Sequence, residues 1–182
     1  MLEIELKAHV ADPEAVKARL SEFMRFVGSF EKNDEYWTVP VVVSAIPTTG
    51  FRFRIRTEPE KATITFKEKT YTNDIEVNNE IEFSVGNMEG FRRFIAKMSA
   101  QQLYVKQKTG TTWVSDDGIQ AELASVSGLG YFLEVELLFA EPVAPSIDET
   151  KARLMSVVER CGLSDSDLEP RPYSQLMGVP RY

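Results

Sequence analysis

The sequence contains one cysteine and one histidine, and each scarcity excludes a class of site. Cys161 alone cannot form an internal disulfide or a multi-cysteine zinc centre. His9 alone leaves no histidine cluster that could hold a metal. Any metal bound by this chain must therefore be held by oxygen ligands.

Long apolar segments and an excess of positive charge are missing as well. No stretch approaches the roughly 18 apolar residues of a membrane-spanning helix, and the N-terminus opens into an alternating charged segment instead of a signal peptide. The 21 Lys and Arg against 28 Asp and Glu give a net charge of −7, which argues against a broad surface for nucleic acid or anionic lipid. We expect a cytoplasmic protein with neither nucleic-acid nor membrane partners.

The remaining composition is that of an ordinary folded domain. Hydrophobic residues make up 43% of the chain and charged residues 27%, with only 10 Gly and 9 Pro. A length of 182 residues suits one domain with a substantial core. Since no linker or convincing repeat interrupts the sequence, we expect a single domain over residues 1–182.

Hydrophobic periodicity predicts three helices. Asp12-Pro13-Glu14 supplies an N-cap and a proline at the first helical position, and an apolar series follows at Val16, Leu20, Phe23 and Val27. A second helix is expected after Asn87, and a third after the capping box from Ser146 to Glu149. The apolar faces of these two helices are Phe91, Phe94, Ile95 and Met98, and Leu154, Val158 and Cys161.

The segments between the helices alternate with the period of strands. Strands are predicted at residues 2–8, 36–39, 51–57, 62–69, 80–85, 104–112, 112–115, 119–126 and 131–139. Residues 40–50 and 141–145 are expected to be loops. Mostly hairpin-like strands with a few inserted helices indicate an antiparallel α+β domain, whose sheet can close on itself.

Each predicted strand collects long charged side chains on one face and apolar ones on the other. The charged face contains Lys7, Arg52, Arg54, Arg56, Lys67, Lys69, Lys106 and Lys108, together with Glu3, Glu5, Glu80, Glu82, Glu122, Glu134 and Glu136. On a solvated face, cross-strand ion pairs of this kind would contribute about 0 to 1 kcal/mol each. Six strands that share the pattern favour instead a charged interior, with the helices covering the apolar faces.

A charged interior is costly unless a ligand neutralises it. Grouped carboxylates with oxygen-only ligation favour Mg²⁺ or Mn²⁺, and a set of Lys and Arg favours phosphate oxygens. A metal-chelated polyphosphate satisfies both groups. The expected partner is therefore a small-molecule triphosphate.

The motifs of the sequence resemble those of the CYTH superfamily, the triphosphate tunnel metalloenzymes, which includes CyaB-type class IV adenylate cyclases and thiamine triphosphatases. Glu3-Ile4-Glu5-Leu6-Lys7 is similar to the ExExK signature of that family. Further similar motifs follow in order over nearly the whole chain: Asp34-Glu35-Tyr36-Trp37, Phe53-Arg54-Ile55-Arg56, Thr65-Phe66-Lys67, Glu80-Ile81-Glu82, Lys106-Gln107-Lys108, Gly128 to Glu136, and Tyr173 to Met177.

This resemblance implies an eight-stranded antiparallel closed β-barrel, the triphosphate tunnel, with a charged lumen and helices packed outside. It implies that Glu5, Lys7 and Glu134 are catalytic, and that Mg²⁺ or Mn²⁺ is the cofactor. The implied metal ligands are Glu3, Glu5, Glu122, Glu134 and Glu136, and the implied triphosphate contacts are Lys7, Arg54, Arg56, Lys67, Lys106 and Lys108.

Two positions depart from the family pattern. Ala124 stands where the family usually has an aspartate, and Glu122 is its candidate substitute, although it is displaced by roughly 6 to 7 Å along the strand. Lys108 stands where an arginine is common, which removes a bidentate grip on phosphate. Because Ala124 lacks the expected carboxylate, the number of bound metals stays open.

Four weaker assignments concern residues outside this set. Arg52 and Lys69 share the charged face and fit rim charges at least as well as triphosphate contacts, and Glu80 and Glu82 are expected to orient the basic side chains. His9 is expected at the surface. The side chains of Tyr36, Trp37 and Tyr173 fit either a structural role or stacking on an organic substrate.

The preferred function is metal-dependent hydrolysis of an inorganic or organic triphosphate: tripolyphosphate, a nucleoside triphosphate or thiamine triphosphate. The alternative is a class IV adenylate cyclase, in which the ribose 3′-hydroxyl of ATP attacks the α-phosphate. A second alternative is a non-catalytic binder of polyphosphate or nucleotide, and a third is a purely structural module. The sequence does not choose among substrates, and it leaves the oligomeric state open, a homodimer included.

Overall fold

The computed structural model describes residues 2–39, 51–59, 61–72, 75–140 and 146–179; the side chains at 51, 68–72 and 75–76 are not described. The predicted loops at 40–50 and 141–145 lie outside these residues. Among the described residues, none of the helices is long and apolar enough to cross a membrane.

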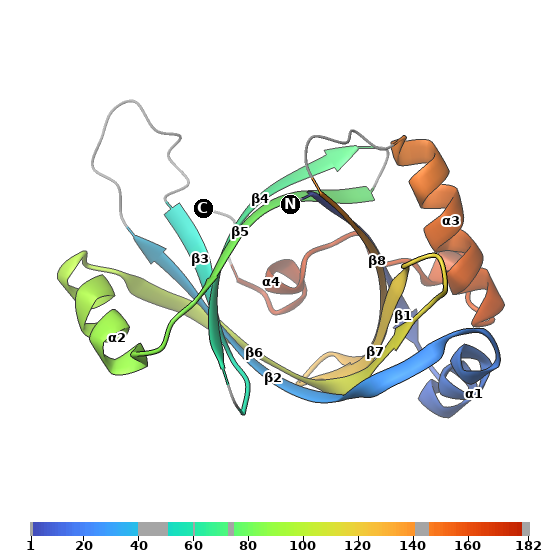
Figure 1. The fold of residues 1–182 in the computed structure, drawn as a ribbon, viewed down its shortest axis with the longest axis horizontal. Coiled ribbons are helices and arrows are strands. Elements are labelled where there is room, and N and C mark those ends of the chain that lie inside the picture. Colours follow the sequence, from blue (N-terminus) through green and yellow to red (C-terminus); the bar gives the residue numbers. More distant parts are fainter. Residues whose placement is uncertain (1, 40–50, 60, 73–74, 141–145, 180–182) are drawn as a thin grey trace. The chain divides into compact units, whose positions relative to one another are not determined.

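Eight antiparallel strands form a closed barrel in the order β1-β5-β4-β3-β2-β6-β7-β8 (Figure 1). The predicted α+β closed barrel is therefore confirmed. The strands are β1 (Leu2–Val10), β2 (Arg25–Val39), β3 (Phe51–Thr57), β4 (Ala62–Thr72), β5 (Ile75–Ser84), β6 (Gln101–Val114), β7 (Gln120–Val126) and β8 (Gly130–Phe139). The helices are α1 (Pro13–Phe23), α2 (Met88–Lys97), α3 (Ile147–Arg160), the short 3₁₀ helix η1 (Asp165–Asp167) and α4 (Tyr173–Leu176).

The contacts between residues divide the chain into two compact units. The first comprises Met1–Phe30, Glu68–Glu80 and Lys108–Arg171, and the second Glu31–Lys67, Ile81–Gln107 and Pro172–Tyr182. Each unit has its own apolar cluster. The expectation of a single domain over 1–182 stays a prediction.

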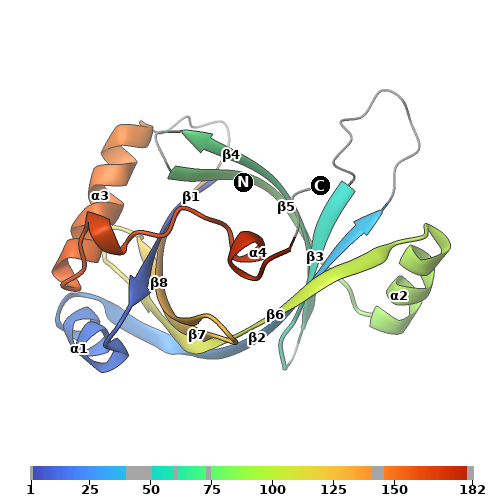
Figure 2. The same ribbon diagram turned by 180° about the vertical axis from the view of Figure 1, so that it is seen from behind.

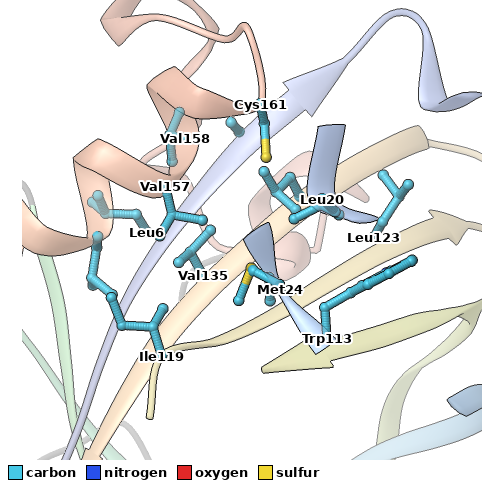
Figure 3. Close-up of a cluster of buried hydrophobic side chains, with 14 of the residues drawn as sticks. Leu6, Leu20, Met24, Trp113, Ile119, Leu123, Val135, Val157, Val158 and Cys161 are labelled. Atoms are coloured by element: carbon cyan, nitrogen blue, oxygen red, sulfur yellow. The ribbon is translucent and has the colours of Figure 1, made fainter. Parts of the chain in front are cut away.

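In the first unit, α1 and α3 cover the apolar face of β1, β7 and β8. Both helices lie beside these strands in the two views (Figures 1 and 2). The strands contribute Leu6, Leu123 and Val135 to the core, and the helices contribute Leu20 and Val158, among others (Figure 3). Cys161 lies in this cluster as predicted.

Local sequence predicts where α1 and α3 begin, but not where α1 ends. The Asp12 side chain accepts a hydrogen bond from the Ala15 amide at 3.0 Å, and the Ser146 hydroxyl accepts one from the Glu149 amide at 3.3 Å, as N-caps do. The prediction that α1 reaches Val27 was wrong. The helix ends at Phe23, and Met24 is already extended. Val27 is an exposed residue of β2. Phe26 and Val27 belong to residue types that favour strands.

The second unit has a smaller core of Phe53, Ile55, Ile64 and Ile95. Ile95 comes from α2, and Phe91 of the same helix packs against the cluster. The predicted buried face of α2 was wrong at Phe94 and Met98, which are exposed. An ion pair between Arg92 and Glu35 also ties α2 to β2.

Other strand limits differ from the expected ones. β2 starts at Arg25 and β5 at Ile75, earlier than predicted, because their first residues lack clear alternation. The two strands predicted at 104–112 and 112–115 are one strand, β6. Gly110 lets β6 lie against β7 there, since a Cβ at this position would come within 2.3 Å of the Leu123 carbonyl oxygen.

Truncation of Leu154, which is fully buried between α3 and the sheet, should lower the free energy of unfolding by about 2 to 5 kcal/mol. The matched control is Leu138→Ala, whose side chain is 49% exposed and should cost less than about 1 kcal/mol. Urea denaturation of Leu154→Ala and the control measures both. Equal losses would contradict the described core.

Candidate functional site

The charged side chains lie on the strand face opposite the helix-covered one. In β1, Ile4, Leu6 and Ala8 belong to the apolar core, so Glu3, Glu5 and Lys7 point to the other side. Glu3 and Lys7 are nevertheless buried. The five predicted metal ligands lie in the first unit together with Lys7 and Lys108, and the other predicted phosphate contacts, Arg54, Arg56, Lys67 and Lys106, lie in the second.

The acidic group centres on Glu3, Glu5 and Glu136. One carboxylate oxygen from each lies within 4.8 Å of the others. Glu5 and Glu136 are directly opposite in the pairing of β1 with β8, a destabilising arrangement for like charges. Burial, together with the charges of Glu3 and Glu5, raises the pKa of Glu136 well above its ordinary value. A donor set of carboxylate oxygens fits Mg²⁺ or Mn²⁺.

Two amide side chains hold these carboxylates in place. Asn78 Nδ2 donates to Glu3 Oε1 at 2.9 Å, and Gln120 Nε2 donates to Glu136 Oε1 at 2.6 Å. In both cases the partners are directly opposite each other on neighbouring strands. Because an amide is neutral, it orients the carboxylate without cancelling its charge.

The other two predicted metal ligands have a different environment. Glu122 and Glu134 face each other across β7 and β8, and both pair with the ammonium of Lys108. The distance from Lys108 Nζ to Glu122 Oε2 is 3.2 Å, and only 3% of the Lys108 side chain is exposed. Glu122 and Glu134 therefore form a pair of their own, which shares the Lys108 ammonium.

Lys7 is held by the segment that follows η1. Its Nζ donates to the Arg171 carbonyl oxygen at 2.6 Å, and the Glu169 amide donates to the Lys7 carbonyl oxygen at 2.7 Å. The buried Glu169 carboxylate accepts hydrogen bonds from Arg171 Nε at 2.8 Å and interacts with His9 Nε2 at 2.9 Å. Half of the His9 side chain is exposed, in keeping with its predicted place at the surface.

A cleft of about 440 Å³ adjoins this segment. Its charged lining consists of Glu5, Lys7, Lys151, Asp165 and Glu169. The cleft therefore reaches two of the three residues predicted to be catalytic, and both signs of charge line it.

The basic group of the second unit is built around a buried carboxylate. Arg56 donates to Asp34 with Nε at 2.7 Å and Nη2 at 2.8 Å, and Lys106 Nζ lies 3.4 Å from Asp34 Oδ2. Asp34 is fully buried. Burial alone would raise the pKa of Asp34, but the Arg56 hydrogen bond and the charges of Lys106, Arg56 and Arg54 hold it well below its ordinary value.

Arg54 is positioned by a relay of side chains. Its Nη2 donates to Thr65 Oγ1 at 2.9 Å, and that hydroxyl donates to Glu82 Oε1 at 2.9 Å. Glu82 thus orients a basic residue, which is the role expected for it. Lys67 lies two residues from Thr65 on the same strand face and is partly exposed. The Lys69 side chain lies outside the described residues.

Aromatic rings flank Lys106. Tyr36 and Tyr104 stack with ring centroids 4.3 Å apart and an interplanar angle of 8°. The Lys106 ammonium lies 5.6 Å from the Tyr36 ring centroid and 4.6 Å from that of Tyr173 in α4. These contacts place Lys106 beside the rings of Tyr36 and Tyr173, and the choice between a structural role and stacking on a substrate stays open for both tyrosines.

The roles predicted for the site residues stay predictions, but their placement is now specific. Asn78, Gln120 and Glu169 are not among the predicted site residues, which are all charged residues of predicted strands. Alternation was a usable signal for two of them: Asn78 shares its face with Glu80 and Glu82, and Gln120 shares its face with Glu122. Glu169 lies outside any strand, and no local pattern marks it.

Acid titration should reveal the role of Glu169. The Arg171 hydrogen bonds lower the pKa of Glu169 from 4.5 to about 2, so its ionised form stabilises the fold above pH 4.5. This contribution, on the order of 1 to 3 kcal/mol, is lost as the pH falls from about 4.5 towards 2. Glu169→Gln should therefore be less stable than the unmodified chain at pH 7, and urea denaturation should show the difference shrinking below pH 4.5.

The control for this titration is Glu22→Gln, on the exposed side of α1. It should change stability little at any pH. A stability difference for Glu169→Gln that is constant from pH 7 to pH 3 would contradict the assigned hydrogen bonds.

Comparison with known proteins gives similarity over nearly the whole chain. No protein-family profile matches the sequence. A candidate adenylate cyclase from Methanocaldococcus jannaschii is 23% identical over 180 residues, which cover 98% of this chain and 100% of that protein. The structure of a conserved hypothetical protein from Pyrococcus furiosus superposes with a TM-score of 0.77 at 27% identity, covering 96% of this chain and 99% of the other.

A plant protein has the same fold at lower identity. It comes from Hippeastrum and is described as a candidate adenylyl cyclase with a dominant triphosphatase activity. Its TM-score is 0.64 at 14% identity, over 98% of this chain and 94% of the plant chain.

Proposed function

We propose that this chain is a member of the CYTH superfamily of triphosphate tunnel metalloenzymes and a metal-dependent enzyme that transfers a phosphoryl group from a triphosphate to water. The observation that carries the proposal is the convergence of Glu3, Glu5 and Glu136, whose carboxylate oxygens lie within 4.8 Å of one another. Its substrates would be tripolyphosphate, a nucleoside triphosphate or thiamine triphosphate.

The acidic group is the proposed cofactor site. Glu3, Glu5 and Glu136 would hold Mg²⁺ or Mn²⁺, which supplies positive charge against the charge that develops on the phosphates. The raised pKa of Glu136 supports this assignment, because a bound cation would relieve the repulsion that causes the shift. Asn78 and Gln120 would keep the carboxylates oriented.

The basic group is the proposed phosphate site. Arg56, Arg54 and Lys106 bring three positive charges around one carboxylate, Asp34, so the group keeps a net positive charge. Asp34 fixes the plane of the Arg56 guanidinium, and Thr65 fixes that of Arg54. Pre-oriented guanidinium groups bind phosphate oxygens with little further loss of side-chain freedom.

The residues proposed to act in the reaction itself are Glu5, Lys7 and Glu134. Lys7, oriented by the Arg171 carbonyl, would stabilise negative charge as the phosphoryl group is transferred. Glu134 lies directly opposite Lys7 in the strand pairing and would orient the attacking water. Glu5 would act through the cation that it helps to bind.

Cyclisation of ATP to cyclic AMP and pyrophosphate is the second candidate function. The name of the Methanocaldococcus jannaschii protein, which matches over its whole length, favours it. The Hippeastrum protein is named a candidate adenylyl cyclase but described with a dominant triphosphatase activity, so the fold alone does not separate the two functions. Ala124, which adds no carboxylate beside Glu122, is the reason to keep a non-catalytic polyphosphate or nucleotide binder as a third outcome.

Replacement of Glu5 should abolish turnover while the fold is kept. We expect Glu5→Ala to lower the rate by at least about 100-fold, because it removes one cation ligand. The assay supplies Mg²⁺ or Mn²⁺ with tripolyphosphate, ATP or thiamine triphosphate, and measures phosphate, pyrophosphate and cyclic AMP. Asp117→Ala, an exposed carboxylate paired with Arg153, is the control and should retain the rate.

These products separate the three outcomes. Phosphate release supports hydrolysis, and cyclic AMP with pyrophosphate supports the cyclase. Binding of triphosphate without any product would select the binder. An unchanged rate in Glu5→Ala would refute the metal assignment.

Replacement of Arg56 should weaken substrate binding. Since a hydrogen bond to a charged group contributes about 1.5 to 3 kcal/mol, Arg56→Ala should raise KM for the triphosphate about 10- to 100-fold. Arg92→Ala is a matched control, because Arg92 also pairs with a β2 carboxylate, Glu35, but on the helix-covered face. Steady-state kinetics should show KM unchanged in the control; an equal rise in both variants would contradict the phosphate site.

A further inference from the structure

The hydrogen bonds and ion pairs described for the five carboxylates predicted as metal ligands include two kinds of partner. Glu3 and Glu136 accept hydrogen bonds from the neutral amides of Asn78 and Gln120, and Glu5 lies beside them. Glu122 and Glu134 are paired with the positive charge of Lys108. The strand register fixes this division, since Glu3 is opposite Asn78, and Glu122 is opposite Glu134.

The partners decide how much negative charge is left for a bound ion. Glu3, Glu5 and Glu136 offer carboxylate oxygens within 4.8 Å of one another, and two of the three accept hydrogen bonds from neutral amides. The Glu122 and Glu134 pair already has a cation between its members, and the Lys108 side chain is almost completely buried there. A buried ammonium is stable only with such close partners, so Lys108 and the two carboxylates depend on one another.

β7 contributes no carboxylate other than Glu122. Ala124 lies two residues from Glu122 on the same strand face and is buried. It is directly opposite Gly110, and a Cβ on Gly110 would come within 2.8 Å of the Ala124 Cα. The two strands therefore lie close together at the position where a third carboxylate would complete a second cluster.

We propose that the Lys108 ammonium is a built-in cation of the site, which occupies the Glu122 and Glu134 carboxylates and limits the chain to one divalent cation, on Glu3, Glu5 and Glu136. The inference rests on the proposed function. It changes the role of Lys108 from a phosphate contact to a substitute for a second metal.

The test starts from metal-free protein without any substrate. It measures how many Mn²⁺ ions bind to each chain. Calorimetric titration and electron paramagnetic resonance of unbound Mn²⁺ both give the stoichiometry. We expect one Mn²⁺ per unmodified chain and two per Lys108→Met chain, because the apolar side chain leaves Glu122 and Glu134 to a second ion. Lys108→Arg keeps the positive charge and should bind one.

Three further variants make the count specific. Lys61→Met removes an exposed lysine that pairs with Glu58, and it should still bind one Mn²⁺. Glu5→Gln should bind Mn²⁺ at least about 10-fold more weakly. Lys108→Gln keeps a donor but no charge, and it should bind two Mn²⁺; it serves if Lys108→Met does not fold.

Each result has a definite meaning. Two Mn²⁺ in the unmodified chain, or one in both neutral Lys108 variants, would overturn the inference. No Mn²⁺ in the unmodified chain would overturn it together with the proposed cofactor site. One Mn²⁺ in the unmodified chain and two in Lys108→Met, but no turnover of any triphosphate, would support the inference and refute the proposed enzyme.

Discussion

Repulsion among buried carboxylates is the constraint on which the candidate site depends. Glu5 and Glu136 lie directly opposite each other on paired strands, and Glu3 brings a third oxygen within 4.8 Å. Like charges in this position destabilise a sheet, and burial increases the cost. The chain meets this cost by folding a substantial core of α1 and α3 on the other face of the same strands, so the apolar face stabilises what the charged face destabilises.

The chain balances its buried charges in three ways. Neutral amides orient carboxylates without discharging them, at Glu3 and Glu136. A single lysine neutralises half of the charge of a carboxylate pair, at Glu122 and Glu134. In the second unit a single carboxylate, Asp34, organises several cations and leaves them in excess.

Local sequence was enough to predict part of each barrel strand and the charged face of β1, although not the limits of β2, β5 and β6. Alternation in a segment such as 2–8 directly identifies which side chains share a face, and it assigned Glu3, Glu5 and Lys7 correctly to the face opposite the core. It could not identify partners across strands. Whether Lys108 meets phosphate or carboxylate depends on the register of β6, β7 and β8, which pairs residues far apart in the sequence.

The same limit explains the other differences. Asn78 and Gln120 are polar but uncharged, so their importance appears only once the register places them opposite Glu3 and Glu136. Glu169 depends on the return of the chain to β1 over more than a hundred residues, which no periodicity encodes. α1 ends early because strand propensity outweighs helix propensity at Phe26 and Val27.

The arrangement of signs is what distinguishes a ligand site from a solvated charged sheet. A face stabilised by its own ion pairs would place opposite charges across from each other, because those pairs are favourable and like pairs are not. Lys7 with Glu134 follows that rule, but Glu5 with Glu136 and Glu122 with Glu134 violate it. One violation is compensated inside the chain by Lys108. In the proposed function, an external cation on the carboxylate oxygens of Glu3, Glu5 and Glu136 would compensate the other.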